Sequence, residues 1–278
     1  MTERSVLITG CSSGIGHVAA GMLRARGFRV FATARKPEDV ARLAAEGFEA
    51  LALDYEDSAS LKACVEEISR RTKGRLYALY NNGAFGQTGA LEDVSRDVMR
   101  RQFEANVFGW HELTNLCLPL LRAEGDARII NTSSVLGIVA MPFRGGYNAS
   151  KFAIEALSET LKQELWDTGI RVILINPGPI TSAFRDNAVK AFEDSIDEEG
   201  SAHHRAAYQK QRDTLMRGDN SFLTLPPEAV VKKVIHALES RNPRPRYNVT
   251  LATGIMALGK RLLPQRLFDW FLHAASRA

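Results

Sequence analysis

Short apolar runs alternate with longer amphipathic stretches through most of the chain. The runs are rich in Val, Ile, Leu and Ala, whereas the stretches between them repeat apolar residues at helical spacing. Buried parallel strands joined by helices produce this alternation. The pattern predicts strands at residues 5–9, 28–36, 49–54, 76–84, 127–134 and 170–176, with a seventh at 246–253. We therefore expect an α/β fold: a doubly wound parallel sheet of about seven strands, a Rossmann fold, with helices on both faces.

Two segments near the end depart from this alternation. Residues 182–225 mix many charges with apolar side chains such as Phe184, Phe222 and Leu223, which predicts an amphipathic helical lid over a pocket. The tail at 254–278 places Leu, Trp and Phe beside basic residues, and we expect it to be helical. It should pack on its own domain or on a partner subunit in a homodimer or homotetramer, and peripheral membrane contact is the alternative.

Composition and charge narrow the function classes. The chain has 278 residues, 45% hydrophobic and 24% charged, which suits one globular domain over residues 1–278. Its net charge of +4 comes from dispersed Lys and Arg, so no nucleic-acid partner is expected. Three distant cysteines indicate reduced thiols in the cytoplasm, and the sequence suggests neither a signal peptide nor a transmembrane segment. His203 and His204 lack metal-ligand spacing, so no metal is expected.

A glycine-rich turn follows the first strand and opens a helix. Gly10 permits the tight turn, Gly14 lets the backbone approach a diphosphate, and Gly16 allows the helix to pack closely on the strand. The diphosphate of a dinucleotide would then lie at the helix N-terminus. The spacing is G-x-x-x-G-x-G, and its position between strand and helix favours cofactor binding over an ordinary turn.

The end of the second strand bears on which dinucleotide is bound. An NAD-binding fold places an acid about 20 residues after the glycines, on the ribose 2′-hydroxyl. This chain has Arg35 there, and a guanidinium suits a 2′-phosphate, so NADP is preferred over NAD. Asp54, at the end of the third strand, is either a helix cap or an adenine contact, and the sequence does not separate these roles.

Tyr147 and Lys151 form the candidate catalytic pair. They are four residues apart at the start of a predicted helix ending at Gly169, so both lie on one helix face. A cation one turn away should lower the pKa of the phenol and make Tyr147 a general acid or base. Ser134, at the end of the fifth strand, could hydrogen-bond a substrate oxygen beside the phenol.

Two further segments carry polar residues at the expected ligand-binding edge or near it. The fourth strand delivers N-N-G-A, from Asn81 to Ala84, at its carboxyl end, where open α/β sheets bind ligands. Asn106 lies inside a helix predicted over 96–122. Because asparagine is a middling helix former, its simplest interpretation from the sequence alone is a tolerated, half-exposed residue.

Together these motifs resemble the short-chain dehydrogenase/reductase family over about residues 5 to 182. T-G-C-S-S-G-I-G, N-N-G-A, the Asn106 helix, S-x12-Y-x3-K and P-G occur in the family's order and spacing. The family usually has N-N-A-G at the fourth strand, so Gly83 and Ala84 are inverted here. The lid and tail are closer in pattern to the hydroxysteroid and retinol dehydrogenases than to the shorter acyl-carrier-protein reductases.

The resemblance implies roles for individual residues. Asn106 would hold a water in a proton relay, Ser134 would orient the substrate oxygen, Tyr147 would act as acid/base, and Lys151 would bind the nicotinamide ribose. The implied cofactor-binding residues are Gly10, Ser12, Ser13, Gly14, Ile15, Gly16, Arg35, Asp54, Asn82, Gly83, Tyr147, Lys151, Pro177, Gly178, Ile180 and Thr181.

The sequence therefore predicts an NADP-dependent oxidoreductase that transfers a hydride between nicotinamide and a carbonyl or secondary alcohol. The apolar lid and tail favour a lipophilic ketone or aldehyde of steroid, retinoid or long-chain type. The alternatives are an acyl-thioester ketoreductase, a non-catalytic NADP-sensing protein, and an epimerase or dehydratase on the same fold. A sensor would be free to lose the four catalytic residues, and the epimerases generally show a different glycine spacing.

Overall fold

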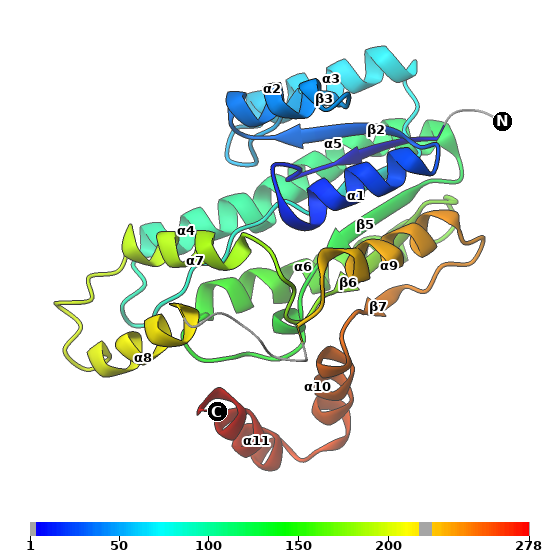
Figure 1. The fold of residues 1–278 in the computed structure, drawn as a ribbon. Coiled ribbons are helices and arrows are strands. Elements are labelled where there is room, and N and C mark those ends of the chain that lie inside the picture. Colours follow the sequence, from blue (N-terminus) through cyan, green and yellow to red (C-terminus); the bar gives the residue numbers. More distant parts are fainter. Residues whose placement is uncertain (1–3, 217–223, 278) are drawn as a thin grey trace.

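The computed structural model describes residues 4–216 and 224–277, and a seven-stranded parallel sheet forms its centre (Figure 1). The strands are β1 (Ser5–Ile8), β2 (Arg29–Ala34), β3 (Glu49–Ala52), β4 (Ala78–Asn81), β5 (Arg128–Thr132), β6 (Arg171–Asn176) and β7 (Arg246–Asn248). Their order across the sheet is β3-β2-β1-β4-β5-β6-β7, and every pair is parallel. The predicted α/β, doubly wound fold is confirmed.

Helices cover both faces of the sheet. The long helices are α1 (Gly14–Ala25), α2 (Pro37–Ala45), α3 (Ser58–Thr72), α4 (Arg96–Phe103), α5 (Gly109–Glu124), α6 (Gly145–Glu164), α7 (Phe184–Glu193), α8 (Arg205–Met216), α9 (Pro227–Glu239), α10 (Leu251–Leu262) and α11 (Gln265–Arg277). Two short turns of helix, η1 (Glu104–Phe108) and η2 (Val135–Gly137), complete the structure. α1 and α9 pack together on one face, and α3 and α5 pack together on the other.

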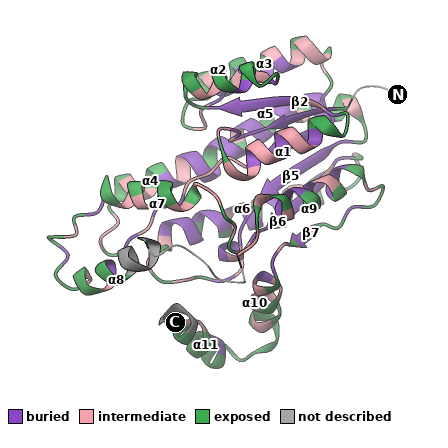
Figure 2. Cartoon of the chain, viewed as in Figure 1, coloured by how far each residue is buried: buried purple, intermediate pink, exposed green. Residues whose placement is uncertain are grey.

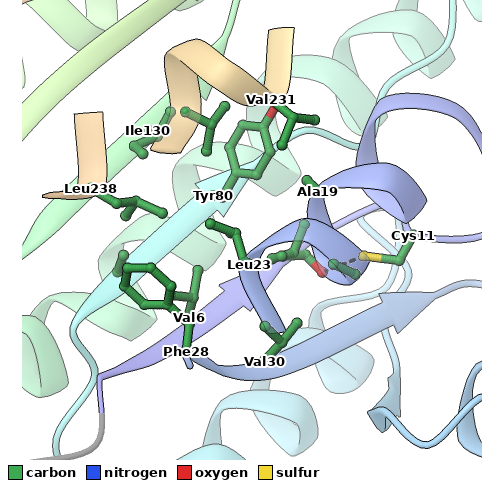
Figure 3. Packing of buried hydrophobic residues seen from close by; sticks show 14 of the residues in the cluster. Val6, Cys11, Ala19, Leu23, Phe28, Val30, Tyr80, Ile130, Val231 and Leu238 are labelled. Atoms are coloured by element: carbon green, nitrogen blue, oxygen red, sulfur yellow. Dashed lines mark hydrogen bonds between the residues drawn. The ribbon is translucent and has the colours of Figure 1, made fainter. Parts of the chain in front are cut away.

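The core has two layers because side chains alternate across each strand. Val6 and Ile8 of β1 belong to the layer beneath α1 and α9, and Figure 3 shows part of this layer, including Val6. Leu7 belongs to the opposite layer. The strand register keeps side chains that are paired across neighbouring strands on the same face of the sheet. Leu7, for example, pairs with both Phe31 and Leu79. Burial is accordingly concentrated in the sheet and the inner helix faces (Figure 2).

The three cysteines are free and buried in these layers. Cys11 belongs to the layer of α1 and α9, whereas Cys64 and Cys117 belong to the layer of α3 and α5. Burial raises the pKa of Cys11 to about 12 and has the same effect on Cys64.

The strand order reverses between β1 and β4, because the chain leaves β1 first toward β2 and later returns beside it as β4. The carboxyl ends of these two neighbours therefore diverge and leave a crevice, the usual ligand site of open α/β sheets. Gly10 and Gly83 follow β1 and β4 at this point. The topology thus brings the two predicted cofactor turns together.

Three element predictions need correction. The helix predicted over 96–122 is interrupted by the π-helical segment η1, which inserts an extra residue into the turn. The predicted strand 246–253 ends at Asn248, because the Thr250 side chain accepts a hydrogen bond from the Thr253 amide and starts α10. The helix that carries Tyr147 ends at Glu164 and not at Gly169.

The region predicted to form a lid contains α7 and α8. Phe192 of α7 and Tyr208 of α8 pack with ring centroids 5.0 Å apart, and the Tyr208 hydroxyl accepts a hydrogen bond from the Ala90 amide at 2.8 Å. Phe184 begins α7 and lies against Tyr147, with ring centroids 5.4 Å apart. Phe222 and Leu223, also expected in the lid, lie outside the described residues.

The tail forms two helices, α10 and α11, that project from the edge of the sheet beyond β7 (Figure 1). α10 touches β7 and η2, and Thr253 is buried at this contact. Phe268 of α11 is buried against α10, where a Cβ on Gly259 would lie 3.2 Å from its ring. Among the described residues, none of the helices is both long enough and apolar enough to cross a bilayer.

Candidate active site

The glycine turn after β1 touches the turn after β4 backbone to backbone. Gly10 has φ +67°, and a Cβ built on it would lie 2.5 Å from the Gly83 Cα. A Cβ on Gly16 would lie 2.2 Å from the Gly10 carbonyl oxygen. Real Cβ atoms do not approach so closely, so only glycine fits at positions 10 and 16. These contacts hold the first turn of α1 against the end of the sheet.

The N-terminus of α1 is open toward this crevice. Ser13 is the N-cap residue, yet its side chain makes no capping hydrogen bond. Its hydroxyl and the first amides of the helix can therefore serve a bound anion. The neighbouring Ser12 offers its carbonyl to Arg42, which donates from Nη2 at 2.6 Å. This arrangement suits the diphosphate of a dinucleotide.

Thr9, which the sequence analysis missed, joins the two turns. Its hydroxyl oxygen accepts hydrogen bonds from the amides of Asn82 at 2.8 Å and Gly83 at 3.1 Å, and from the Tyr55 hydroxyl at 2.7 Å. The same Tyr55 hydroxyl lies 3.2 Å from Asn81 Oδ1, which is its alternative acceptor. A buried polar residue at the last position of an apolar strand was the available signal, since such a group must find partners.

Trp110 is the second residue that the sequence analysis missed. Its indole Nε1 donates to the Gly83 carbonyl at 2.7 Å, and its ring centroid lies 4.6 Å from Lys151 Nζ. Ala84, the inverted residue of N-N-G-A, packs against the apolar cluster of Trp110, Ile154 and Leu174. The inversion is therefore accommodated, because Gly83 lies at the close approach to Gly10 and the Cβ of Ala84 meets an apolar neighbour.

Asn106 is fully buried in η1, so the half-exposed interpretation is wrong. Its Nδ2 donates to the Phe85 carbonyl at 2.9 Å and to Ser150 Oγ at 3.2 Å, and its Oδ1 accepts from the Phe85 amide at 3.2 Å. Ser150 directly precedes Lys151. The π-helical turn thus directs Asn106 toward the start of α6, a common position for such turns at functional sites.

Ser134 and Tyr147 meet between the end of β5 and the start of α6. The Ser134 Oγ accepts from the Leu136 amide at 3.1 Å, which fixes η2, and the same hydroxyl lies close enough to the Tyr147 phenol to lower its pKa. Both side chains are buried. Ser133, the neighbouring serine, has a buried hydroxyl with no hydrogen-bond partner among the described residues. The geometry therefore favours Ser134 as the partner of the phenol.

Lys151 lies one turn after Tyr147 and is almost fully buried, at 1% exposure. Its Nζ donates to the Thr132 carbonyl at 2.8 Å. Burial lowers the pKa of this amine to about 7, and the negative charge of Glu155 opposes the shift. The lysine is thus held in place by the sheet, ready to bind a polar ligand group.

The expected lowering of the Tyr147 pKa is not found. Burial raises the pKa of Tyr147 to about 12, against the opposing effects of the polar Ser134 hydroxyl and the charge of Arg144. Lys151 Nζ lies 5.6 Å from the Tyr147 ring centroid and is directed to the sheet. Desolvation of the phenol therefore outweighs the effect of the lysine one helical turn away.

The residues expected at the adenosine end lie near the end of β2. Arg35 is exposed, and its Nη1 lies 4.0 Å from Glu56 Oε1, a loose ion pair that leaves the guanidinium accessible. Asp54 does not cap the next helix, because Asp57 is the N-cap residue of α3. Asp54 Oδ1 instead accepts from the Glu56 amide at 3.1 Å.

The loop after β6 carries the remaining expected cofactor residues. The Pro177 carbonyl accepts from the Val135 amide at 2.7 Å, so this loop adjoins η2 and Ser134. A Cβ on Gly178 would lie 2.2 Å from Thr250 Oγ1. Ile180 packs against the core and Thr181 is exposed. The structure thus places the loop beside the crevice on the side opposite Arg35.

Comparisons with known proteins agree on one family. A family model described as short chain dehydrogenase matches residues 4–192. The chain is 43% identical over 270 residues to the oxidoreductase YbbO of Escherichia coli strain K12, covering 97% of this chain and 94% of that protein. It is 32% identical over 274 residues to the NADPH-dependent 3-dehydrocapnine reductase of Ornithobacterium rhinotracheale, covering 96% and 95%. It is likewise 32% identical over 288 residues to human retinol dehydrogenase 5, covering 98% and 90%.

The fold has close counterparts among solved structures. A short-chain dehydrogenase from Streptomyces avermitilis superposes with a TM-score of 0.77 at 25% identity, covering 100% of this chain and 98% of that one. The likeness therefore extends beyond the motifs to the lid and tail regions.

Burial of Lys151 predicts a pH-dependent stability. Between pH 7 and 10.5 the unfolded chain keeps a proton that the folded amine has released, so the free energy of unfolding rises with pH. Lys151→Met should remove about 1 to 3 kcal/mol of the gain between pH 7 and pH 9.5. Urea denaturation at several pH values measures this, with the exposed, non-titrating Leu157→Met as control. Parallel pH profiles for wild type and Lys151→Met would contradict the assignment.

Proposed function

Because the chain belongs to the short-chain dehydrogenase family, as its motifs predicted, we propose that it is an NADP-dependent oxidoreductase acting on a carbonyl or secondary alcohol. One observation carries the proposal: the Tyr147 phenol, buried beside Ser134 and one turn from Lys151, lies beside the crevice between β1 and β4. NADP(H), when bound, supplies or accepts the hydride at the carbon of the reacting group.

In this proposal the chain's own residues handle the oxygen of the substrate. Ser134 orients that oxygen, and Tyr147 gives it a proton during carbonyl reduction or removes one during alcohol oxidation. With a pKa raised to about 12, the phenol is protonated at neutral pH, which is the form required for reduction. Lys151 would hold the nicotinamide ribose. Asn106, bonded to Ser150, would anchor the proton relay beyond Lys151.

The proposed preference for NADP depends on Arg35. The end of β2 offers a guanidinium where an acid would bind the 2′-hydroxyl of NAD, and the guanidinium is exposed and loosely paired. The name of the Ornithobacterium relative, which states NADPH dependence, supports the same choice. Gly10, Ser13 and the N-terminus of α1 suit the diphosphate that both dinucleotides share.

The proposed substrate is a lipophilic ketone or aldehyde. Phe184 of the lid lies over Tyr147, and a Cβ on Gly86 would be 2.8 Å from its ring, so the wall beside the phenol is aromatic. An apolar wall gains free energy from each buried methylene and gives small polar substrates few partners. Retinol dehydrogenase 5, whose name states a lipophilic alcohol, is a relative over nearly the whole chain.

Tyr147→Phe tests the proposed chemistry. The change keeps the ring against Phe184 and removes only the acid, so kcat should fall by about 10² to 10⁴ while NADPH still binds. Steady-state turnover and a fluorescence titration of NADPH measure the two effects. Tyr247→Phe, which removes an equally buried hydroxyl on β7, should keep kcat near that of wild type. A Tyr147→Phe protein with near-normal kcat would refute the role.

Arg35→Ala tests the cofactor preference. Loss of a charge-assisted hydrogen bond costs about 1.5 to 3 kcal/mol, so the affinity for NADPH should fall roughly tenfold or more and that for NADH should barely change. Titrating both cofactors against wild type and variant decides the question. Arg100→Ala, an exposed arginine on α4, controls for the loss of positive charge. Equal losses for both cofactors would mean that Arg35 does not meet the 2′-phosphate.

A homologous series of aldehydes tests the substrate class. Burying a methylene contributes about 0.8 kcal/mol, so adding two carbons should raise kcat/KM by up to about tenfold until the pocket is full. Phe184→Ala should flatten this dependence, because it removes the aromatic wall beside Tyr147. Phe108→Ala, an exposed phenylalanine at the end of η1, should leave it intact. Efficiency that stays level or falls with chain length would exclude a lipophilic substrate.

A further inference from the structure

The first tail helix, α10, exposes a continuous apolar stripe. Leu251, Ile255, Leu258 and Leu262 are 73%, 53%, 58% and 66% exposed, respectively. Their spacing of four, three and four residues places all of them on one face of the helix. Thr253 is buried on the side toward the body. An apolar surface of this length has a specific purpose in most proteins, because single exposed leucines are common but aligned ones are not.

The second tail helix, α11, continues the apolar surface. Leu267, Trp270 and Phe271 are 50%, 68% and 38% exposed at positions one helical turn apart. Phe268 is buried and joins α11 to α10, so the seam between the helices is already filled. The hairpin of residues 251–277 therefore has an inner seam and an outer apolar surface, and it projects from the body (Figures 1 and 2).

The charge of the hairpin is strongly positive. Residues 251–278 contain four Lys and Arg residues and one Asp. Three of the basic residues, Lys260, Arg261 and Arg266, are exposed where α10 passes into α11, next to the stripe residues Leu262 and Leu267. Basic residues flanking exposed Leu, Trp and Phe are the composition of helices that lie in the interface of anionic membranes.

We propose that the hairpin of residues 251–277 docks on the surface of an anionic lipid bilayer. The exposed Leu, Ile, Trp and Phe side chains enter the interfacial region, and the Arg261 and Arg266 side chains meet the lipid phosphates, whereas Lys260 donates to the Ile138 carbonyl and ties the hairpin to the body. A second copy of the chain fits the surface less well, because a two-fold contact would bring the exposed cations of both hairpins together. The tail attaches to the membrane surface by binding, not by spanning.

A hairpin docked in this way would bring the bilayer surface close to an apolar cavity of the protein. Lys260 Nζ lies 4.5 Å from the ring centroid of Phe152, whose side chain helps to line a cavity of about 550 Å³ on the outer face of α6. The cavity is lined by Leu91, Ala140, Met141, Pro142, Phe143, Gly145, Asn148, Ala149 and Phe152. Tyr147 and Lys151 face the opposite side of α6, so this cavity is separate from the catalytic pair.

Vesicle binding by the full chain tests the proposal, and it needs neither cofactor nor substrate. The protein should sediment with vesicles of equal parts phosphatidylglycerol and phosphatidylcholine about tenfold more than with phosphatidylcholine alone, and high salt should weaken binding. The double variant Ile255→Ser/Leu258→Ser should lose at least about tenfold in vesicle affinity. Both positions are exposed, so its thermal unfolding should match that of wild type. Trp166→Ser, 73% exposed just beyond α6, should bind like wild type.

Tryptophan fluorescence identifies the inserted residue. Trp270 should shift to shorter wavelength on anionic vesicles and be quenched by brominated acyl chains. The shift should vanish in Trp270→Phe and persist in Trp166→Ser. Absence of wild-type sedimentation with anionic vesicles would overturn the proposal. A wild-type dimer that becomes a monomer in Ile255→Ser/Leu258→Ser, with no vesicle binding by either, would identify the surface as a subunit interface instead.

Discussion

The backbone contact between Gly10 and Gly83 is the constraint on which the rest of the candidate site depends. Because no side chain fits between them, the turns after β1 and β4 touch, and α1 begins at a fixed point above the sheet. Trp110 then bonds to the Gly83 carbonyl and lies beside Lys151. A contact between two glycines thus sets the position of the turn proposed to bind a diphosphate, and through Trp110 it adjoins Lys151.

Much of this arrangement was predictable because it depends on local pattern. The strand–helix alternation predicted the doubly wound parallel fold, the glycine spacing predicted the turn, and four-residue spacing placed Tyr147 and Lys151 on one helix face. Thr9, Tyr55 and Trp110 escaped prediction because their importance comes from partners distant in the sequence. These partners meet only in the folded chain, so the spacing of apolar residues along the sequence does not reveal them.

The protonation of the site was the least predictable property. Sequence spacing shows that a cation lies one turn from Tyr147, but it shows neither the direction of the ammonium nor the depth of the phenol. In the fold, Lys151 is bonded to Thr132 and the phenol is desolvated, so burial prevails over the neighbouring charge. The same limit applies to Asn106, whose inward direction depends on one extra residue in a helical turn.

Because the three thiols are buried, the folded protein should not react with thiol-alkylating reagents. A thiol reacts as its thiolate, and burial raises the pKa of Cys11 to about 12, so the group is both inaccessible and protonated. Cys11 lies in the layer of α1 and α9, and Cys64 and Cys117 lie in the layer of α3 and α5. Labelling each cysteine separately therefore reports the opening of one side of the sheet independently of the other. The cysteines thus provide separate probes of unfolding on the two sides of the sheet, and Cys11 directly follows Gly10 in the turn proposed to bind a diphosphate.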